Sequence, residues 1–166
     1  MAGRTGNPNV ASALFAATLA VTIVGIFISI YLFFTDPGLA YRVAALILVG
    51  VVGLLSFVRH SVFYRSDQAR MGWSQDHPEF QLEVGYANLA VGIVAILAAG
   101  LNWGSFACGI ILLIYALYLL CTLLLHVYEA IYVKDIRGRA AKSAGYSAIF
   151  VIVLFVFAFL SLSGAH

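Results

Sequence analysis

Charged side chains are scarce in this chain of 166 residues, because Asp, Glu, Lys and Arg make up only 10% of it and the net charge is +2. A charge this small argues against a nucleic-acid partner, since binding to phosphates requires a strongly basic surface. Cysteine is also scarce. Cys108 and Cys121 lie on one predicted helix, about 20 Å apart along its axis, and this distance excludes a disulfide between them.

Motifs that would specify a reaction are missing as well. The chain has no nucleotide-binding motif, no His-Glu-x-x-His zinc-protease pattern and no evident nucleophile. The connections between its apolar runs are too short to hold a soluble catalytic domain. The sequence therefore leaves open whether the protein is an enzyme.

Apolar residues make up 63% of the chain and fall into five long runs. A helix rises about 1.5 Å per residue, so about 20 apolar residues cross the hydrocarbon layer of a bilayer. We predict an all-α integral membrane bundle of five transmembrane helices, forming a single domain over residues 1–166. The helices are expected at residues 9–34, 40–60 with a cytoplasmic extension to about 71, 78–100, 105–132 and 145–163. Close helix packing is expected at Gly50, Gly53, Gly85 and Gly92.

Basic residues are distributed unequally between the two ends of these helices. Five crossings place eight of the nine on one side, and only Arg42 lies on the other. The eight are Arg4, Arg59, Arg65, Arg70, Lys134, Arg137, Arg139 and Lys142. By the positive-inside rule the N-terminus is cytoplasmic and the C-terminus extracytoplasmic, in a multi-pass protein of the cell membrane.

One polar face follows the second apolar run into the longer cytoplasmic connection. Its residues recur at spacings of four, four, three and four: Ser56, His60, Tyr64, Asp67 and Met71. At about 100° per residue they share one face of a helix. The basic residues Arg59, Arg65 and Arg70 are expected to point elsewhere.

A second polar stripe lies on the Leu-rich fourth run. Its residues recur at spacings of three, four, four and three: Tyr115, Tyr118, Thr122, His126 and Glu129. This face is expected to point into the bundle, because lipid would leave its polar groups unpaired. The amide of Asn88, on the third run, needs a partner in the membrane, and the two tyrosines or Thr122 are candidates.

Several short stretches resemble the signature of an uncharacterised bacterial family of small multi-span membrane proteins. They are Arg59-His60, Met71-Gly72-Trp73, Pro78-Glu79-Phe80-Gln81 and Glu83-Val84-Gly85-Tyr86-Ala87-Asn88-Leu89. The resemblance implies a membrane fold in a bacterial inner membrane, and it implies no activity because that family has none assigned. It points to His60, Trp73, Gln81, Glu83 and Asn88.

Four ionisable side chains fall at one depth, near the cytoplasmic ends of the second, third and fourth helices: His60, Glu83, His126 and Glu129. If these helices pack with their polar faces together, the four side chains face the interior and could hold a zinc or iron ion, or a proton. The two histidines could instead be axial haem ligands, which is a minor option. The supporting polar residues would be Tyr64, Asp67, Gln81, Asn88, Tyr115, Tyr118 and Thr122.

Structural roles compete with these functional ones. His60 and Glu83 lie close enough to the interface to reach water or an arginine, and His126 with Glu129 can simply lock two helices together. Two classes of function therefore remain. The first is a metal or proton site that serves a membrane enzyme or carrier, and the second is an accessory subunit of a larger membrane complex. A homo-oligomer is compatible with either class.

The distribution of basic residues predicts the topology. A reporter fused after His166 should be extracytoplasmic, and one inserted near Arg139 should be cytoplasmic. Paired alkaline phosphatase and fluorescent-protein fusions measure this directly. The reverse pattern, or both reporters on one side, would contradict the five-helix topology.

Overall fold

The computed structural model describes residues 6–72 and 78–164, and this part of the chain is almost entirely helical and contains no strand. Five helical segments are long and apolar enough to cross a membrane, as the sequence predicts. They are Pro8–Phe33, Pro37–Val62, Glu79–Gly100, Ser105–Tyr132 and Lys134–Leu162.

Three of these spans are single α-helices: α1 (Pro8–Phe33), α5 (Glu79–Gly100) and α6 (Ser105–Tyr132). The second span joins α2 (Pro37–Ala44), the π-helix η1 (Ala45–Val51), α3 (Val52–Phe57) and the π-helix η2 (Val58–Val62). The fifth span joins the 3-10 turn η3 (Lys134–Ile136) to α7 (Arg137–Leu162). A short helix, α4 (Tyr64–Met71), follows the second span.

Local sequence explains where the first two spans begin. The side chain of Asn7 accepts a hydrogen bond from the backbone N–H of Asn9, and that of Asp36 accepts one from Leu39. Each cap is followed directly by a proline, Pro8 or Pro37. A proline in the first turn loses no hydrogen bond, because the first N–H groups of a helix have no partner within it.

The structure corrects two predicted boundaries. The second span does not run as one regular helix to residue 71, because Phe63 adopts φ −107° and ψ 30° and separates η2 from α4. The fifth helix begins at Arg137 rather than at residue 145, so its first turns carry the basic residues of the connection. Gly72 ends α4 with a φ of 78°, a conformation that favours glycine, and Trp73 lies outside the described residues.

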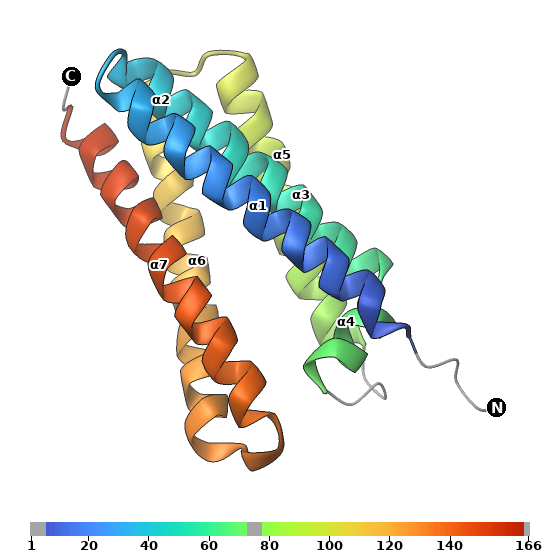
Figure 1. Ribbon diagram of the computed structural model, residues 1–166. Helices are drawn as coiled ribbons and strands as arrows, with labels where there is room; N and C mark the ends of the chain where they lie inside the picture. Colours follow the sequence, from blue (N-terminus) through green and yellow to red (C-terminus); the bar gives the residue numbers. More distant parts are fainter. Residues whose placement is uncertain (1–5, 73–77, 165–166) are drawn as a thin grey trace.

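The spans form a wedge. α6 and α7 run side by side as a hairpin, which meets the other spans at the α2 end of the bundle and diverges from them at the α4 end (Figure 1). α1 begins at the α4 end and α7 finishes at the opposite end (Figure 1). The largest fully buried side chains of the apolar core include Tyr41, Leu48, Leu112 and Leu154. These residues come from the half of the bundle where the spans converge.

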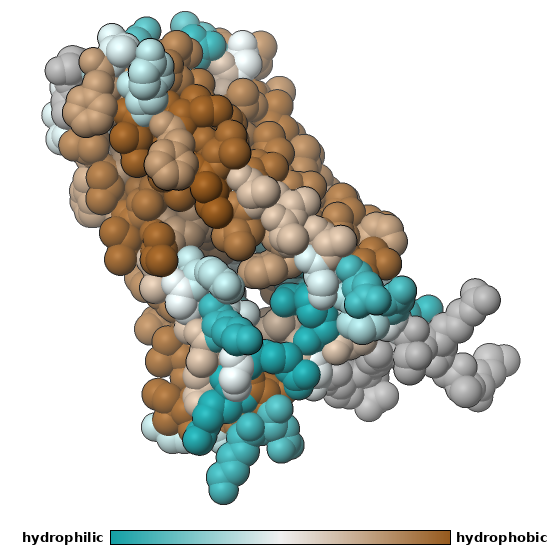
Figure 2. Space-filling view, in the orientation of Figure 1, coloured by the Kyte–Doolittle hydropathy of each residue, from teal (hydrophilic) through white to brown (hydrophobic). Residues whose placement is uncertain are grey.

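The surface matches a membrane protein. A broad apolar band covers most of the visible face, and hydrophilic residues gather chiefly at the α4 end, with a smaller group at the other end (Figure 2). Large apolar side chains such as Phe27, Tyr31, Ile149 and Phe159 are exposed on α1 and α7. A bilayer supplies the apolar surroundings that these side chains require.

Glycines hold the second span against α5, which confirms the predicted close packing. A Cβ atom at Gly53 would lie 2.8 Å from the backbone oxygen of Asn88, and one at Gly92 would lie 3.1 Å from the oxygen of Gly50. A Cβ at Gly85 would collide with the side chain of Ser61. These backbones therefore approach more closely than any larger residue would allow.

The contact at Gly53 predicts that Gly53→Ala destabilises the protein, because the new methyl group must displace the backbone of α5. Thermal unfolding in detergent should occur at a lower temperature for this variant. Gly145→Ala in α7 is the matched control, since a Cβ there meets no atom within 4 Å. Replacing an unconstrained helical glycine by alanine stabilises by about 1 kcal/mol, so the two variants should shift the midpoint in opposite directions. Equal shifts would contradict the close contact.

Candidate functional site

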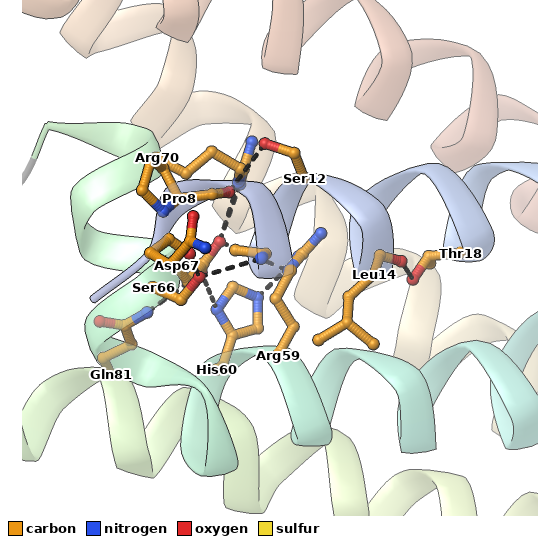
Figure 3. A network of polar contacts seen from close by, with 12 residues as sticks. Pro8, Ser12, Leu14, Thr18, Arg59, His60, Ser66, Asp67, Arg70 and Gln81 are labelled. Carbon is orange, nitrogen blue, oxygen red and sulfur yellow. Dashed lines mark hydrogen bonds and ion pairs between the residues drawn. The ribbon is translucent and has the colours of Figure 1, made fainter.

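Within the part of the chain that the structure describes, the carboxylate of Asp67, on α4, has the most polar contacts. Its side chain is fully buried, with 0% exposure. α4 is fixed to the start of α1 by Ser66, whose hydroxyl donates to the carbonyl of Asn7 and accepts from the backbone N–H of Ala11 at 3.0 Å. The short helix therefore carries Asp67 between α1, η2 and α5 (Figure 3).

Four side chains surround this carboxylate. Arg70 donates to Oδ1 from Nε at 3.0 Å, with its Nη2 also 3.0 Å away, and Gln81 of α5 donates to Oδ2 at 3.0 Å. Nδ1 of His60 lies 2.8 Å from Oδ2, and Nε of Arg59 lies 3.7 Å from Oδ1. Asp67 thus joins η2, α4 and α5 through one buried charge (Figure 3).

His60 is neutral in this arrangement. Nη2 of Arg59 lies 2.8 Å from Nε2 of His60, and because a guanidinium can only donate, Nε2 must accept. The proton of the imidazole is therefore on Nδ1, facing Asp67. The π-helix η2 contributes to this geometry, since its wider turn lets two consecutive residues reach the same cluster.

Asp67 is ionised. Burial by itself would raise the pKa of the carboxyl, but contact with His60 and the positive charges of Arg59 and Arg70 together hold it well below its ordinary value. Both guanidinium groups also lie over the ring of Phe15, at 5.3 Å for Arg59 and 5.0 Å for Arg70. An aromatic face stabilises a cation that has been removed from water.

A second polar cluster confirms the predicted partners of Asn88. Its Oδ1 accepts from the hydroxyl of Tyr115 at 3.0 Å, and its Nδ2 donates to the hydroxyl of Tyr118 at 3.0 Å. Thr122 bonds instead to the carbonyl of Tyr118 within α6. This cluster fastens α5 to α6.

The four residues predicted to share one site occupy three different settings. His60 contacts Asp67, and Nδ1 of His126 lies 3.2 Å from Oε2 of Glu129 within α6. Glu83 is exposed on α5, which corrects the expectation that it faces the interior. No group of three or more His, Cys, Asp or Glu side chains within residues 6–72 and 78–164 is placed to hold a metal ion. Metal binding therefore stays a prediction that rests on the sequence.

Two arginines and one tyrosine also depart from their expected positions. Arg59 and Arg70 were expected to point away from the polar face, yet both reach Asp67. The ring of Tyr64 lies against the guanidinium of Arg65, 5.4 Å from ring centroid to Cζ, so within residues 6–72 and 78–164 this side chain lies beside the network rather than in it. The spacing of Asp67 and Arg70, three residues apart on a short helix, is the one sequence signal for this pairing.

A cavity of about 390 Å³ fills the wedge beside this network. Arg59, His60 and Gln81 line one wall, and side chains of α6 and α7 that include His126 and Ser147 line the other. Most of the remaining lining is apolar. The cavity has the size and the composition of a small-molecule site, namely an apolar space of about 300–1,000 Å³ with a few convergent polar groups.

Comparison with known proteins places the chain in a family without assigning a role. The family of unknown function DUF6790 matches residues 8–166, so the chain belongs to this family. This agrees with the resemblance to an uncharacterised family of membrane proteins. Comparison with curated proteins and with solved structures gives no match.

The network predicts that Asp67→Asn destabilises the protein strongly, because Arg59 and Arg70 would keep their buried charges without a counter-ion. Removing one partner of a buried pair costs about 3–5 kcal/mol. Thermal unfolding in detergent measures the loss. Asp135→Asn, an exposed acid in the η3 turn, is the matched control and should change stability little.

The difference in stability between the wild-type protein and Asp67→Asn depends on pH in a defined way. Because the carboxyl pKa is lower in the folded state, the stability that Asp67 provides is fully present above its ordinary pKa of 3.8 and is lost as the pH falls toward the lower pKa. The difference between wild type and Asp67→Asn should be constant near neutrality and shrink below about pH 4. A difference that already disappears between pH 5 and 8 would show that Asp67 is not held as an anion.

Proposed function

We propose that this DUF6790 member is a small membrane-embedded binding protein, acting as a carrier or as part of a membrane enzyme, whose site is the cavity in the wedge. The observation that carries the proposal is the wall of this cavity, where buried Arg59 and half-buried His60 lie within an apolar span. An ionisable residue within a membrane segment is costly unless it is paired, and it is by default a hypothesis of a functional site.

The shape of the network supports a site over a purely structural role. A group that only fastens helices is best enclosed on all sides, whereas Arg59, His60, Arg70 and Gln81 all line the cavity. The irregular helix η2 carries two of them, and single π turns within helices are frequent at functional sites. Ligand binding gives a reason for both features.

The charge distribution supports an orientation for this site. Eight of nine basic residues lie in segments on the same side as α4, so we place the α4 end at the cytoplasmic face of a cell membrane. The cavity would then open toward the cytoplasmic leaflet.

A proton or a metal ion is the second candidate occupant, because His60 and His126 line the same cavity from opposite walls. Zinc or iron, or haem with two axial histidines, would have to displace Arg59 or Asp67 from the ring of His60, because both of its nitrogens are engaged. The positive charges of Arg59 and Arg70 beside His60 disfavour an added cation, so a metal ion ranks below an organic ligand. Elemental analysis of the purified protein tests this candidate.

An accessory subunit of a larger complex, or a homo-oligomer, is the alternative in which the network serves stability alone. In that case the cavity would hold no specific occupant, and filling it should be harmless. This difference allows a direct test.

The proposal predicts that a small molecule is retained in the cavity during mild purification. Native mass spectrometry of the wild-type protein should show a bound species in stoichiometric amount, and Ser147→Phe should lose it because the new ring occupies the cavity. Ile152→Phe is the matched control, since Ile152 is exposed on the outer face of the same helix. It should retain the bound species.

Each outcome of this experiment decides between the classes. Loss of the species only in Ser147→Phe supports a binding site in the wedge. A wild-type protein that carries no organic molecule and no ion, together with a more stable Ser147→Phe variant, would favour the accessory role.

A further inference from the structure

Arg59 lies where two cavities adjoin. A second cavity of about 380 Å³ lies between α1, α6 and α7, and its lining includes Thr22, Ile26 and Phe150. Arg59, Ser56 and Ser147 line both cavities. The space beside the polar network therefore continues into an apolar one, with a guanidinium group at the junction.

The guanidinium of Arg59 has hydrogen-bonding capacity to spare. The residue is only 9% exposed, and its Nη2 is engaged by His60. Nη1 and Nε are buried and have no hydrogen-bond partner among residues 6–72 and 78–164; the nearest acid, Asp67, lies 3.7 Å from Nε. Buried N–H donors normally have a hydrogen-bond acceptor. The nearby carboxylate of Asp67 is already bonded to Arg70 and Gln81.

The wall also carries an excess of positive charge. Arg59 and Arg70 contribute two positive charges, Asp67 contributes one negative charge, and His60 is neutral. Neither cavity has an acidic residue among the described residues that line it. His126, on the far wall, is paired with its own carboxylate, Glu129. An anion is the occupant that would balance this charge.

We infer that the two cavities together bind an anionic amphiphile, with its carboxylate or phosphate head on Arg59 and its alkyl chain between α1 and α7. The inference rests on the proposed function and names the class of ligand. An oxyanion supplies the acceptors that the guanidinium lacks, and a single alkyl chain suits the apolar lining of the second cavity. A free fatty acid and the head group of a bilayer phospholipid both have this chemistry.

The test compares ligands with the same chain and different heads on the full-length protein in detergent. Oleate is the anionic probe and oleyl alcohol is the uncharged one, with affinities measured by native mass spectrometry and calorimetry. Oleate should bind the wild-type protein at least tenfold more tightly, since hydrogen bonds to a charged group are worth more than neutral ones. This comparison needs no variant, so it does not depend on whether a substitution folds.

Variants then locate the head and the chain. Arg59→Gln should lower the affinity for oleate to that for oleyl alcohol. Arg65 is an exposed arginine of α4, and Arg65→Gln should change the affinity for neither ligand. Thr22→Trp should weaken both ligands by filling the second cavity, and Val24→Trp, whose side chain is exposed on α1, should not. Together these changes assign the head to Arg59 and the tail to α1.

A lipid arm separates the two sources of the anion. In nanodiscs that contain phosphatidylglycerol and phosphatidylcholine, retention of phosphatidylglycerol through Arg59 would support a bilayer lipid, and binding of oleate alone would support a free fatty acid. Equal binding of oleate and oleyl alcohol would overturn the inference while leaving a ligand-binding cavity intact. Failure of every amphiphile to bind, with a different molecule retained in the purified protein, would also overturn it without refuting the proposed function.

Discussion

The buried carboxylate of Asp67 is the interaction on which the α4 end of this protein depends. It holds Arg70 within α4, Gln81 on α5 and the His60–Arg59 pair on η2, so three segments of the chain meet at one negative charge. Low dielectric surroundings strengthen each of these contacts and make an unpaired partner costly. The arrangement of this end follows from keeping one anion and two cations together.

The two ends of the bundle are held by different forces. At the α2 end, small residues and glycines let the helices approach closely around an apolar core. At the α4 end, the α6–α7 hairpin diverges, and a polar network and a cavity take the place of that core (Figure 1). Close packing at the α2 end holds the hairpin in the bundle while the α4 end keeps a cavity.

The sequence could predict those parts of the site that lie on regular helices. The stripe on α6 and the partners of Asn88 follow from straight helices, in which spacings of three and four residues define a face. The same rule failed for Arg59 and Arg70, because η2 and the turn at Phe63 change the angle between successive side chains. It also failed for Glu83, which is exposed, because the direction of its side chain depends on the rotation of α5.

Sequence alone determined that this is a five-span helical membrane protein, since the hydrocarbon layer imposes a length and a composition that can be read from any apolar run. It also determined which residues are polar in apolar surroundings. Tertiary structure decided which of them meet. Asp67 finds Gln81 across fourteen residues and Ser66 finds Asn7 across fifty-nine, and such pairings are set by helix rotation and crossing, which no local pattern encodes.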